Sequence, residues 1–128
     1  MNPTPRPADS LDLVDPLAPA AFAQRQLNAY NARDLAAFVA EYAEDVVVWR
    51  LPNPEPVLVG REAFAAHYRE HRFQLPGLHA ELVKRITFGN KVIDHERVHG
   101  VQAEPMEVAA IYEVAPEGIK KVWFVSGG

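Results

Sequence analysis

The sequence of 128 residues contains no cysteine. This absence excludes disulfide bonds, catalysis by a thiolate, and zinc sites that use cysteine ligands. No apolar run approaches the ~18–20 residues that cross a bilayer. The N-terminus carries acids and prolines where a secretory signal would have a basic start and an apolar stretch. We therefore expect a cytoplasmic protein that does not associate with a membrane.

An excess of basic residues is also lacking. The 13 Lys and Arg are outnumbered by 17 Asp and Glu, which gives a formal net charge of −4 at pH 7. Binding to a phosphate backbone requires a basic stripe, and the cations here are scattered, so we expect no nucleic-acid partner. The composition that is present, 48% hydrophobic and 23% charged residues, is typical of globular proteins. The length suits one domain with a single core.

Proline separates the first 19 residues from the rest. This segment has few large apolar side chains, and its prolines are Pro3, Pro5, Pro7, Pro16 and Pro19. Such a composition favours an extended arm over a packed element. We therefore divide the chain into an N-terminal arm, residues 1–19, and a single domain, residues 20–128.

Two short helices are predicted at the start of this domain. Phe22, Gln26 and Tyr30 recur at i, i+4 and i+8 within residues 20–32, which indicates one face of a helix. Asp34 can cap a second helix. The stripe of this second helix consists of Leu35, Phe38, Val39 and Tyr42.

A third helix is predicted between Gly60 and the Pro76-Gly77 pair. Its stripe consists of Phe64, His67, Tyr68 and His71. Glycine before the helix and the proline–glycine pair after it are boundary signals.

Five segments rich in β-branched residues are predicted as strands. The first, residues 46–51, is followed by three prolines within residues 52–56, which cannot join a central ladder. Gly89-Asn90 is a two-residue hairpin signal between the second and third strands. The strands after the proline loop are expected at residues 79–88, 91–101, 106–114 and 119–126. Short turns make successive strands antiparallel neighbours, so the fold class is α+β, with a strongly bent, mainly antiparallel sheet wrapped around three helices.

Several stretches carry a family resemblance. They are Tyr-Asn-Ala-Arg-Asp-Leu at residues 30–35, Tyr-Ala-Glu-Asp-Val at residues 42–46, Gly60, Val-Ile-Asp-His-Glu-Arg-Val at residues 92–98, and Ile119 shortly before Val-Trp-Phe. With the order of elements, they resemble the nuclear transport factor 2-like superfamily, and within it the SnoaL-like and ketosteroid-isomerase-like branch. The resemblance implies a cone-shaped α+β barrel with a pocket at its mouth. It also implies a homodimer that forms through the outer face of the sheet.

The catalytic groups of the ketosteroid isomerases do not carry over to this sequence. The resemblance places Gln26 at the position of their helix tyrosine and Arg50 at that of their general base. Their late-strand acid falls at or beside Ala110, where no carboxylate shares the face. Because arginine cannot accept a proton near neutral pH, we expect no isomerisation by the mechanism of the ketosteroid isomerases.

The strand at residues 91–101 holds an unusual set of charged residues. With a period of two, one face carries Val92, Asp94, Glu96 and Val98, and the other carries Ile93, His95, Arg97 and His99. The two valines favour burial of the first face, which would point Asp94 and Glu96 into the cone. The opposite register would place the basic residues inside and the acids at the dimer face. If Asp94 and Glu96 are buried together, their pKa values are raised unless Arg50 or His67 pairs with them. These four residues would then form an acid–base set.

Three further polar residues have both a structural and a functional interpretation. Gln26 lies within an apolar stripe, and either makes a structural hydrogen bond or lines the pocket. Arg50 is either an exposed strand end or, as the resemblance implies, an inward guanidinium that needs a carboxylate. His67 is either a core imidazole held by a carbonyl group or a pocket residue. Pocket positions are also predicted for Tyr30, Tyr68, Ala110 and Tyr112.

The segment from His67 to His71 also matches the H-x-x-E-H pattern of inverted zinc peptidases. Two histidines at i and i+4 share a helix face and could form half of a metal site. Three defined residues are a weak motif, and those enzymes need a larger scaffold. We expect no metal and no cofactor.

Two classes of function follow from these residues. The first is binding and turnover of a small apolar or weakly polar organic molecule by a cofactor-independent isomerase, cyclase, dehydratase or hydrolase. In that model His67 is the acid or base, oriented by Asp94 or Glu96, and Arg50 stabilises developing negative charge. The alternative is a non-catalytic ligand-binding or dimerisation module, in which Arg50, Asp94 and Glu96 form a structural ion-pair cluster.

Overall fold

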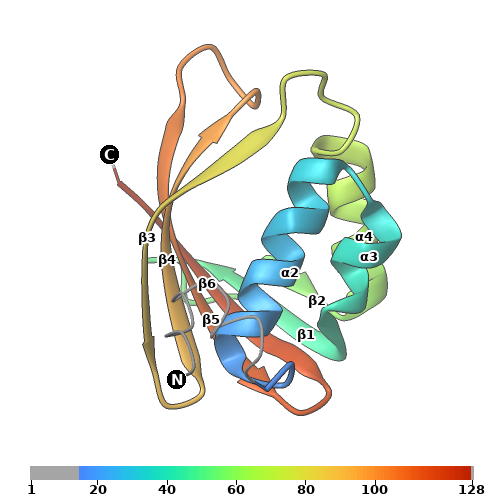
Figure 1. The fold of residues 1–128 in the computed structure, drawn as a ribbon. Helices are drawn as coiled ribbons and strands as arrows, with labels where there is room; N and C mark the ends of the chain where they lie inside the picture. Colours follow the sequence, from blue (N-terminus) through green and yellow to red (C-terminus); the bar gives the residue numbers. More distant parts are fainter. Residues whose placement is uncertain (1–14, 128) are drawn as a thin grey trace, which may run out of the picture.

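The computed structural model describes residues 15–127 of the chain. In chain order, its elements are α2 (Pro19–Ala32), α3 (Leu35–Ala40), β1 (Tyr42–Arg50), β2 (Leu58–Val59), α4 (Arg61–His71), β3 (His79–Phe88), β4 (Lys91–His99), β5 (Met106–Ala115) and β6 (Gly118–Ser126). All three helices lie against the same face of one sheet (Figure 1). The predicted arm falls mostly outside the described residues.

The first two helices lie where their apolar stripes placed them. α2 begins with Pro19, whose missing N–H is not needed in a first turn. It ends at Arg33, which adopts the left-handed conformation with φ 59°. Asp34 caps α3, because its Oδ1 accepts a hydrogen bond from the Ala37 N–H at 3.0 Å. Tyr42, predicted as the last residue of the α3 stripe, instead begins β1.

α4 ends at His71, several residues before its predicted end. The N–H groups of Arg72 and Phe73 both donate to the carbonyl of Tyr68, at 3.1 and 2.9 Å. The Phe73 ring then packs edge-on against Tyr30, with ring centroids 5.5 Å apart. The chain therefore leaves the helix to bring Phe73 against the core.

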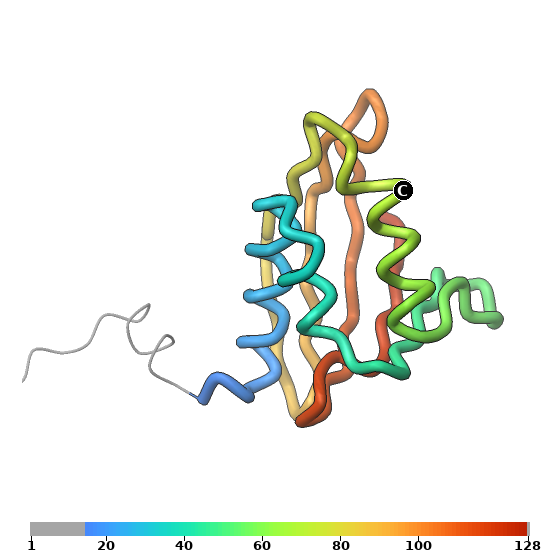
Figure 2. Tube along the Cα trace, turned by 90° about the vertical axis from the view of Figure 1, so that its right-hand side faces the viewer, coloured from blue at the N-terminus to red at the C-terminus, as the bar shows by residue number. Residues whose placement is uncertain are grey.

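The sheet has the strand order β2-β1-β6-β5-β4-β3. The β1–β6 pair is parallel and the other four pairs are antiparallel. The two end strands do not pair with each other, so the bent sheet stays open. Seen from the side, the helices cover its concave face (Figure 2). The α+β class and its cone shape are confirmed, and β2 is the one strand that the sequence did not predict.

β3 contains a β-bulge between Leu82 and Lys84. Val83 is the extra residue, so the inward alternation that runs up to Leu82 shifts by one position after it. Arg85 therefore pairs with Asp94 on the inner face of the sheet, while Lys84 is exposed. This shift decides which cation enters the interior.

The core is an aromatic cluster between the helices and the sheet. Phe38 and Phe64 stack at 5.5 Å between ring centroids. Around them lie Tyr30, Tyr42, Tyr68 and Phe73. These rings fill much of the space between the helices and the sheet.

The turn after β4 touches the segment after α4 at a glycine. β4 ends at His99, two residues before its predicted end, because Gly100 has a φ of 90°. A Cβ at Gly100 would lie 2.3 Å from the carbonyl carbon of Gly77. Only glycine permits this approach, which brings the two turns together at the top of Figure 1.

In the described part of the chain, no helix combines the length and the apolar character needed to cross a membrane.

Candidate functional site

A cavity opens between the helices and the inner face of the sheet. Its volume is about 590 Å³, including the part that is open to solvent. The polar side chains that line it are those of Gln26, Tyr30, Tyr42, Arg50, Tyr68, Arg72, Glu96 and Tyr112. Of the predicted pocket residues, Ala110 is fully buried beneath the cavity and does not line it.

Gln26 organises the floor of the cavity. Its Oε1 accepts a hydrogen bond from the Tyr42 hydroxyl at 2.8 Å, and its Nε2 donates to the Tyr112 hydroxyl at 3.1 Å. The same Nε2 also donates to the carbonyl of Ala23 at 3.0 Å. Gln26 thus makes structural hydrogen bonds and lines the cavity as well. Since the Tyr112 oxygen accepts from Gln26, its own hydrogen is free to point toward a ligand.

Asp94 and Glu96 both lie on the buried face of β4. Asp94 is fully buried and Glu96 is 7% exposed. This is the register that the two flanking valines favoured. The opposite face carries His95, which is exposed.

Arg85 pairs with Asp94, in place of the Arg50 or His67 that we predicted. Its Nε and its second terminal nitrogen donate to the two carboxylate oxygens of Asp94, at 2.7 and 2.9 Å. Its remaining terminal nitrogen donates to Gln24 Oε1 at 2.9 Å. Arg85 was not predicted as a site residue, because the bulge in β3 that turns it inward has no recognisable signal in the sequence.

Glu96 has no hydrogen-bond partner for its carboxyl group among residues 15–127. In that part of the chain, every fully enclosed polar side-chain atom has a partner, so the Glu96 oxygens face the open cavity. Burial, and then the negative charge of Asp94, raise the pKa of Glu96 to about 7, although Arg85 lowers it in part. Both the acid and the carboxylate are therefore populated near neutral pH.

The tyrosines around the cavity are held as neutral hydroxyls. Burial raises the pKa of Tyr68 to about 12, even though the charges of Arg72 and Arg50 oppose the shift. Burial, followed by the charge of Glu96, also raises the pKa of Tyr112 well above its ordinary value. These groups can donate hydrogen bonds over the whole physiological range.

The structure does not bring His67 to either acid. His67 lines a second hollow with Val48, Val57 and Leu58, which borders the main cavity at Arg50, Tyr68 and Phe124. Within the described residues, no hydrogen bond or ion pair joins His67 to Asp94 or Glu96. Burial, and then the positive charges of Arg72, His71 and Arg50, lower the pKa of His67. The predicted orientation of His67 by an acid is therefore wrong.

Arg50 and Arg72 stand at the mouth of the cavity. Arg50 is exposed, and its guanidinium lies 5.5 Å from the ring centroid of Phe124. Arg72 was not predicted as a site residue, because α4 was predicted to continue through it. Among the residues that the structure describes, no three His, Cys, Asp or Glu side chains are grouped to hold a metal. His67 and His71, the pair in the zinc motif, have ring centroids 5.2 Å apart.

An open, bent sheet over three helices, with a cavity at one end, defines the class of cone-shaped α+β proteins. The model of the SnoaL-like domain family matches residues 23–122, and the chain belongs to this family. No protein of curated function matches the sequence.

Solved structures share the fold at low sequence identity. A cystatin-fold protein from Novosphingobium aromaticivorans superposes with a TM-score of 0.76 at 23% identity, covering 84% of this chain and 97% of its own. A SnoaL-like protein from Burkholderia thailandensis gives 0.72 at 23% identity, covering 86% and 94%. A candidate ketosteroid isomerase from Kribbella flavida gives 0.74 at 19% identity, covering 86% and 78%.

Proposed function

We propose that this protein binds a small, mostly apolar carbonyl compound and catalyses a proton transfer on it. The observation that carries the proposal is Glu96, a buried carboxyl group that faces the cavity with no partner among the described residues and has a pKa of about 7. A group with this pKa can both accept and return a proton at neutral pH. The family membership and the structural similarity to a candidate ketosteroid isomerase support an isomerase-type reaction.

In the proposed reaction, the Glu96 carboxylate removes a proton from the carbon next to the carbonyl group. The C–H electron pair forms an enolate, whose oxygen accepts the free hydrogen of Tyr112. The Glu96 carboxylic acid then returns the proton to the same carbon or to a conjugated one. Gln26 fixes the Tyr112 hydroxyl through the 3.1 Å hydrogen bond, so it acts as a positioning residue.

This proposal changes the roles predicted for the site. Glu96 takes the acid–base role that His67 was given, because only Glu96 lines the main cavity. Asp94 acts through its charge on Glu96, not as an orienting partner of a histidine.

The reaction is tested by exchange of a carbon-bound proton with solvent deuterium. We expect the protein to speed loss of the α-proton signal of aryl alkyl ketones in D₂O, followed by NMR. The rate should rise with pH through about 7 and then level, because the ionised Glu96 is the base. Glu96→Gln should lose roughly 10²–10⁴-fold, whereas Glu55→Gln, in the exposed proline loop, should keep the wild-type rate.

The alternative of a non-catalytic ligand-binding module has one observation in its favour. Asp94 and Arg85 form a satisfied ion pair, as a structural cluster would. Ketones that bind in the cavity with no exchange above the buffer rate, in both wild type and Glu96→Gln, would establish this alternative.

We also propose a homodimer through the outer face of the sheet, which none of the helices covers. Trp49 and Trp123 stack there with ring centroids 5.4 Å apart, and Val125 beside them is 37% exposed. An apolar patch of this kind on a sheet face supports association with a second copy.

A further inference from the structure

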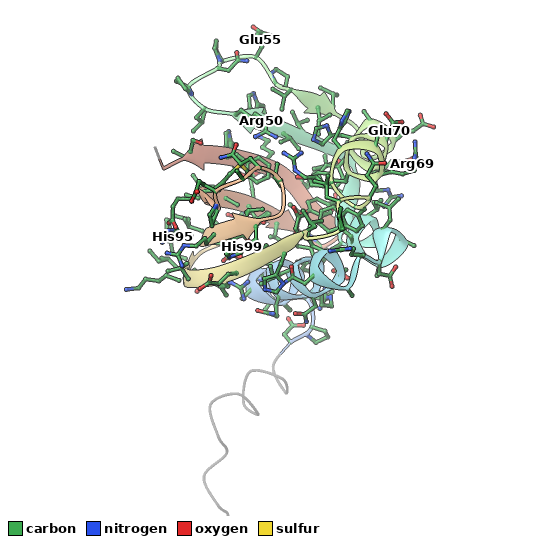
Figure 3. All side chains as sticks on the ribbon, turned by 90° about the horizontal axis from the view of Figure 1, so that it is seen from above. Arg50, Glu55, Arg69, Glu70, His95 and His99 are labelled. Carbon is green, nitrogen blue, oxygen red and sulfur yellow. The ribbon has the colours of Figure 1, made fainter. Side chains whose placement is uncertain are left out.

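Two guanidinium groups converge on the mouth of the cavity from distant parts of the chain. Arg50 is the last residue of β1, and Arg72 follows the last residue of α4. Both line the cavity, and the charges of both act on the hydroxyl of Tyr68 between them. Figure 3 shows Arg50 on the strand side of α4, while Arg69 and Glu70 point away on the outer side of that helix.

Neither guanidinium has a carboxylate partner among residues 15–127. The guanidinium of Arg50 lies over the Phe124 ring, and Arg72 donates to the carbonyl of His71 at 3.0 Å and contacts the Tyr30 hydroxyl. Four other arginines of the described chain each pair with an acid: Arg25, Arg69, Arg85 and Arg97. Within the same residues, Arg33 and Arg61 also lack an acid partner and donate to backbone carbonyls away from the cavity lining. Arg50 and Arg72 are therefore the described arginines without an acid partner that line the cavity.

Glu96 does not serve as their counter-charge. It is the one acid that lines the cavity among the described residues, and the charges that act on it are those of Asp94 and Arg85. The cavity is thus positive at its mouth and carries a single acid deeper inside.

The same cavity is also lined by apolar side chains, among them Val98, Met106, Val108 and Phe124. A ligand that satisfies the whole cavity needs an anion at one end, an apolar body, and a polar group at the other end.

We infer that the ligand is a small organic acid whose carboxylate is bound by Arg50 and Arg72 while its apolar body enters the cavity. Guanidinium groups present planar pairs of donors that match a carboxylate. The opposite orientation would bring the carboxylate toward Glu96 and Asp94, where like charges repel. The inner polar group of the ligand, the carbonyl that faces Glu96, rests on the proposed function, but the anion site does not.

The test compares acids with their neutral esters. The probes are phenylacetate, cyclohexanecarboxylate and 4-oxo-4-phenylbutanoate, each beside its methyl ester, with dissociation constants measured by isothermal titration calorimetry. We expect at least one acid to bind at least about tenfold more tightly than its ester. This preference should weaken as salt is added, because the mouth is partly open to solvent.

Variants assign the preference to the two arginines. Arg50→Met and Arg72→Met should each reduce acid binding about tenfold or more and leave ester binding unchanged. Arg69→Met removes the same charge from the outer side of α4 and should bind like wild type, with circular dichroism confirming that all three variants fold. Loss of acid and ester binding alike would indicate packing and would overturn the inference.

The outcomes also separate this inference from the proposed function. If no acid in the panel binds more tightly than its ester, the inference fails, whether or not ketones exchange protons. If the acid preference is present while Glu96→Gln has no effect on exchange, the anion site stands and the proposed chemistry fails.

Discussion

At the scale of single residues, Asp94 and Glu96 lie two positions apart on β4 but have different surroundings. Asp94 receives two hydrogen bonds from Arg85 and is fully enclosed. Glu96 faces the cavity and has no such partner among the described residues. The charge of Asp94 adds to the effect of burial on Glu96. The Arg85–Asp94 ion pair therefore affects the site as well as the packing, because it occupies Arg85 and leaves Glu96 to titrate near neutral pH.

Glu96 should make stability fall as the pH rises. Its pKa is about 7 in the folded chain and near 4.5 in the unfolded chain. Between these values the folded state holds a proton that the unfolded state has lost, so raising the pH favours unfolding. Between pH 4.5 and 8, the ionisation of Glu96 should lower the free energy of unfolding of the wild type by roughly 2–3 kcal/mol. Glu96→Gln should not show this decrease. Urea denaturation at several pH values measures the difference.

Histidines also titrate in this range, so the comparison needs a second variant. Glu55→Gln changes an acid that is exposed at the tip of the proline loop (Figure 3), and its stability should follow wild type at every pH. A Glu96→Gln curve that stays parallel to wild type across the range would mean that Glu96 is already ionised in the folded protein.

At the scale of elements, the regular periodicities were readable from the sequence and the irregularities were not. The bounds of β3, residues 79–88, and the Asp34 cap followed from residue types alone. The valines around Asp94 were enough for the register of β4. The predicted end of α4 was wrong, because the chain leaves the helix at Arg72 and packs the half-buried Phe73 against Tyr30, ahead of the Pro-Gly signal.

The bulge in β3 had the largest consequence for the site. Alternation from Leu82 alone would have turned Lys84 inward. Because Val83 is extra, Arg85 is the cation that meets Asp94. Single-sequence patterns carry no reliable mark of such a bulge, so the partner of Asp94 could not be assigned.

The bulge predicts that alanine substitutions at two neighbouring cations have unequal effects on stability. Arg85→Ala leaves Asp94 buried without its partner and should cost roughly 2–4 kcal/mol of stability. It should also raise the pKa of Glu96 further, because the charge of Arg85 lowers it. Lys84→Ala removes an exposed side chain and should change stability by less than about 0.5 kcal/mol. Chemical denaturation ranks the two, and equal costs would contradict the bulged register.

At the scale of the whole molecule, the two faces of the sheet have different roles: the inner face lines the cavity, and the outer face is not covered by the helices (Figure 1). The inner face supplies Glu96, Arg50 and Tyr112 to the cavity. The outer face carries the two stacked indoles of β1 and β6 and, on β4 and β5, the ion pair of Arg97 with Glu107. Alternation along each strand keeps the two faces independent, because no residue serves both. A change on the outer face should therefore leave ligand binding intact.

The proposed homodimer through the outer face can be tested because the two faces are independent. Trp123→Glu places a charge in the apolar patch, and we expect it to convert a dimer into a monomer in sedimentation velocity and light scattering. Its circular dichroism and its binding of the acid probes should persist, because Phe124, the neighbour that faces inward, is unchanged.

The matched control is Ala36→Glu, which adds the same charge on an exposed position of α3. Because the helices lie on the opposite side of the sheet (Figure 1), this variant should keep the dimer. A wild-type chain that sediments as a monomer up to about 100 μM would refute the dimer, since specific interfaces of standard size bind more tightly than that.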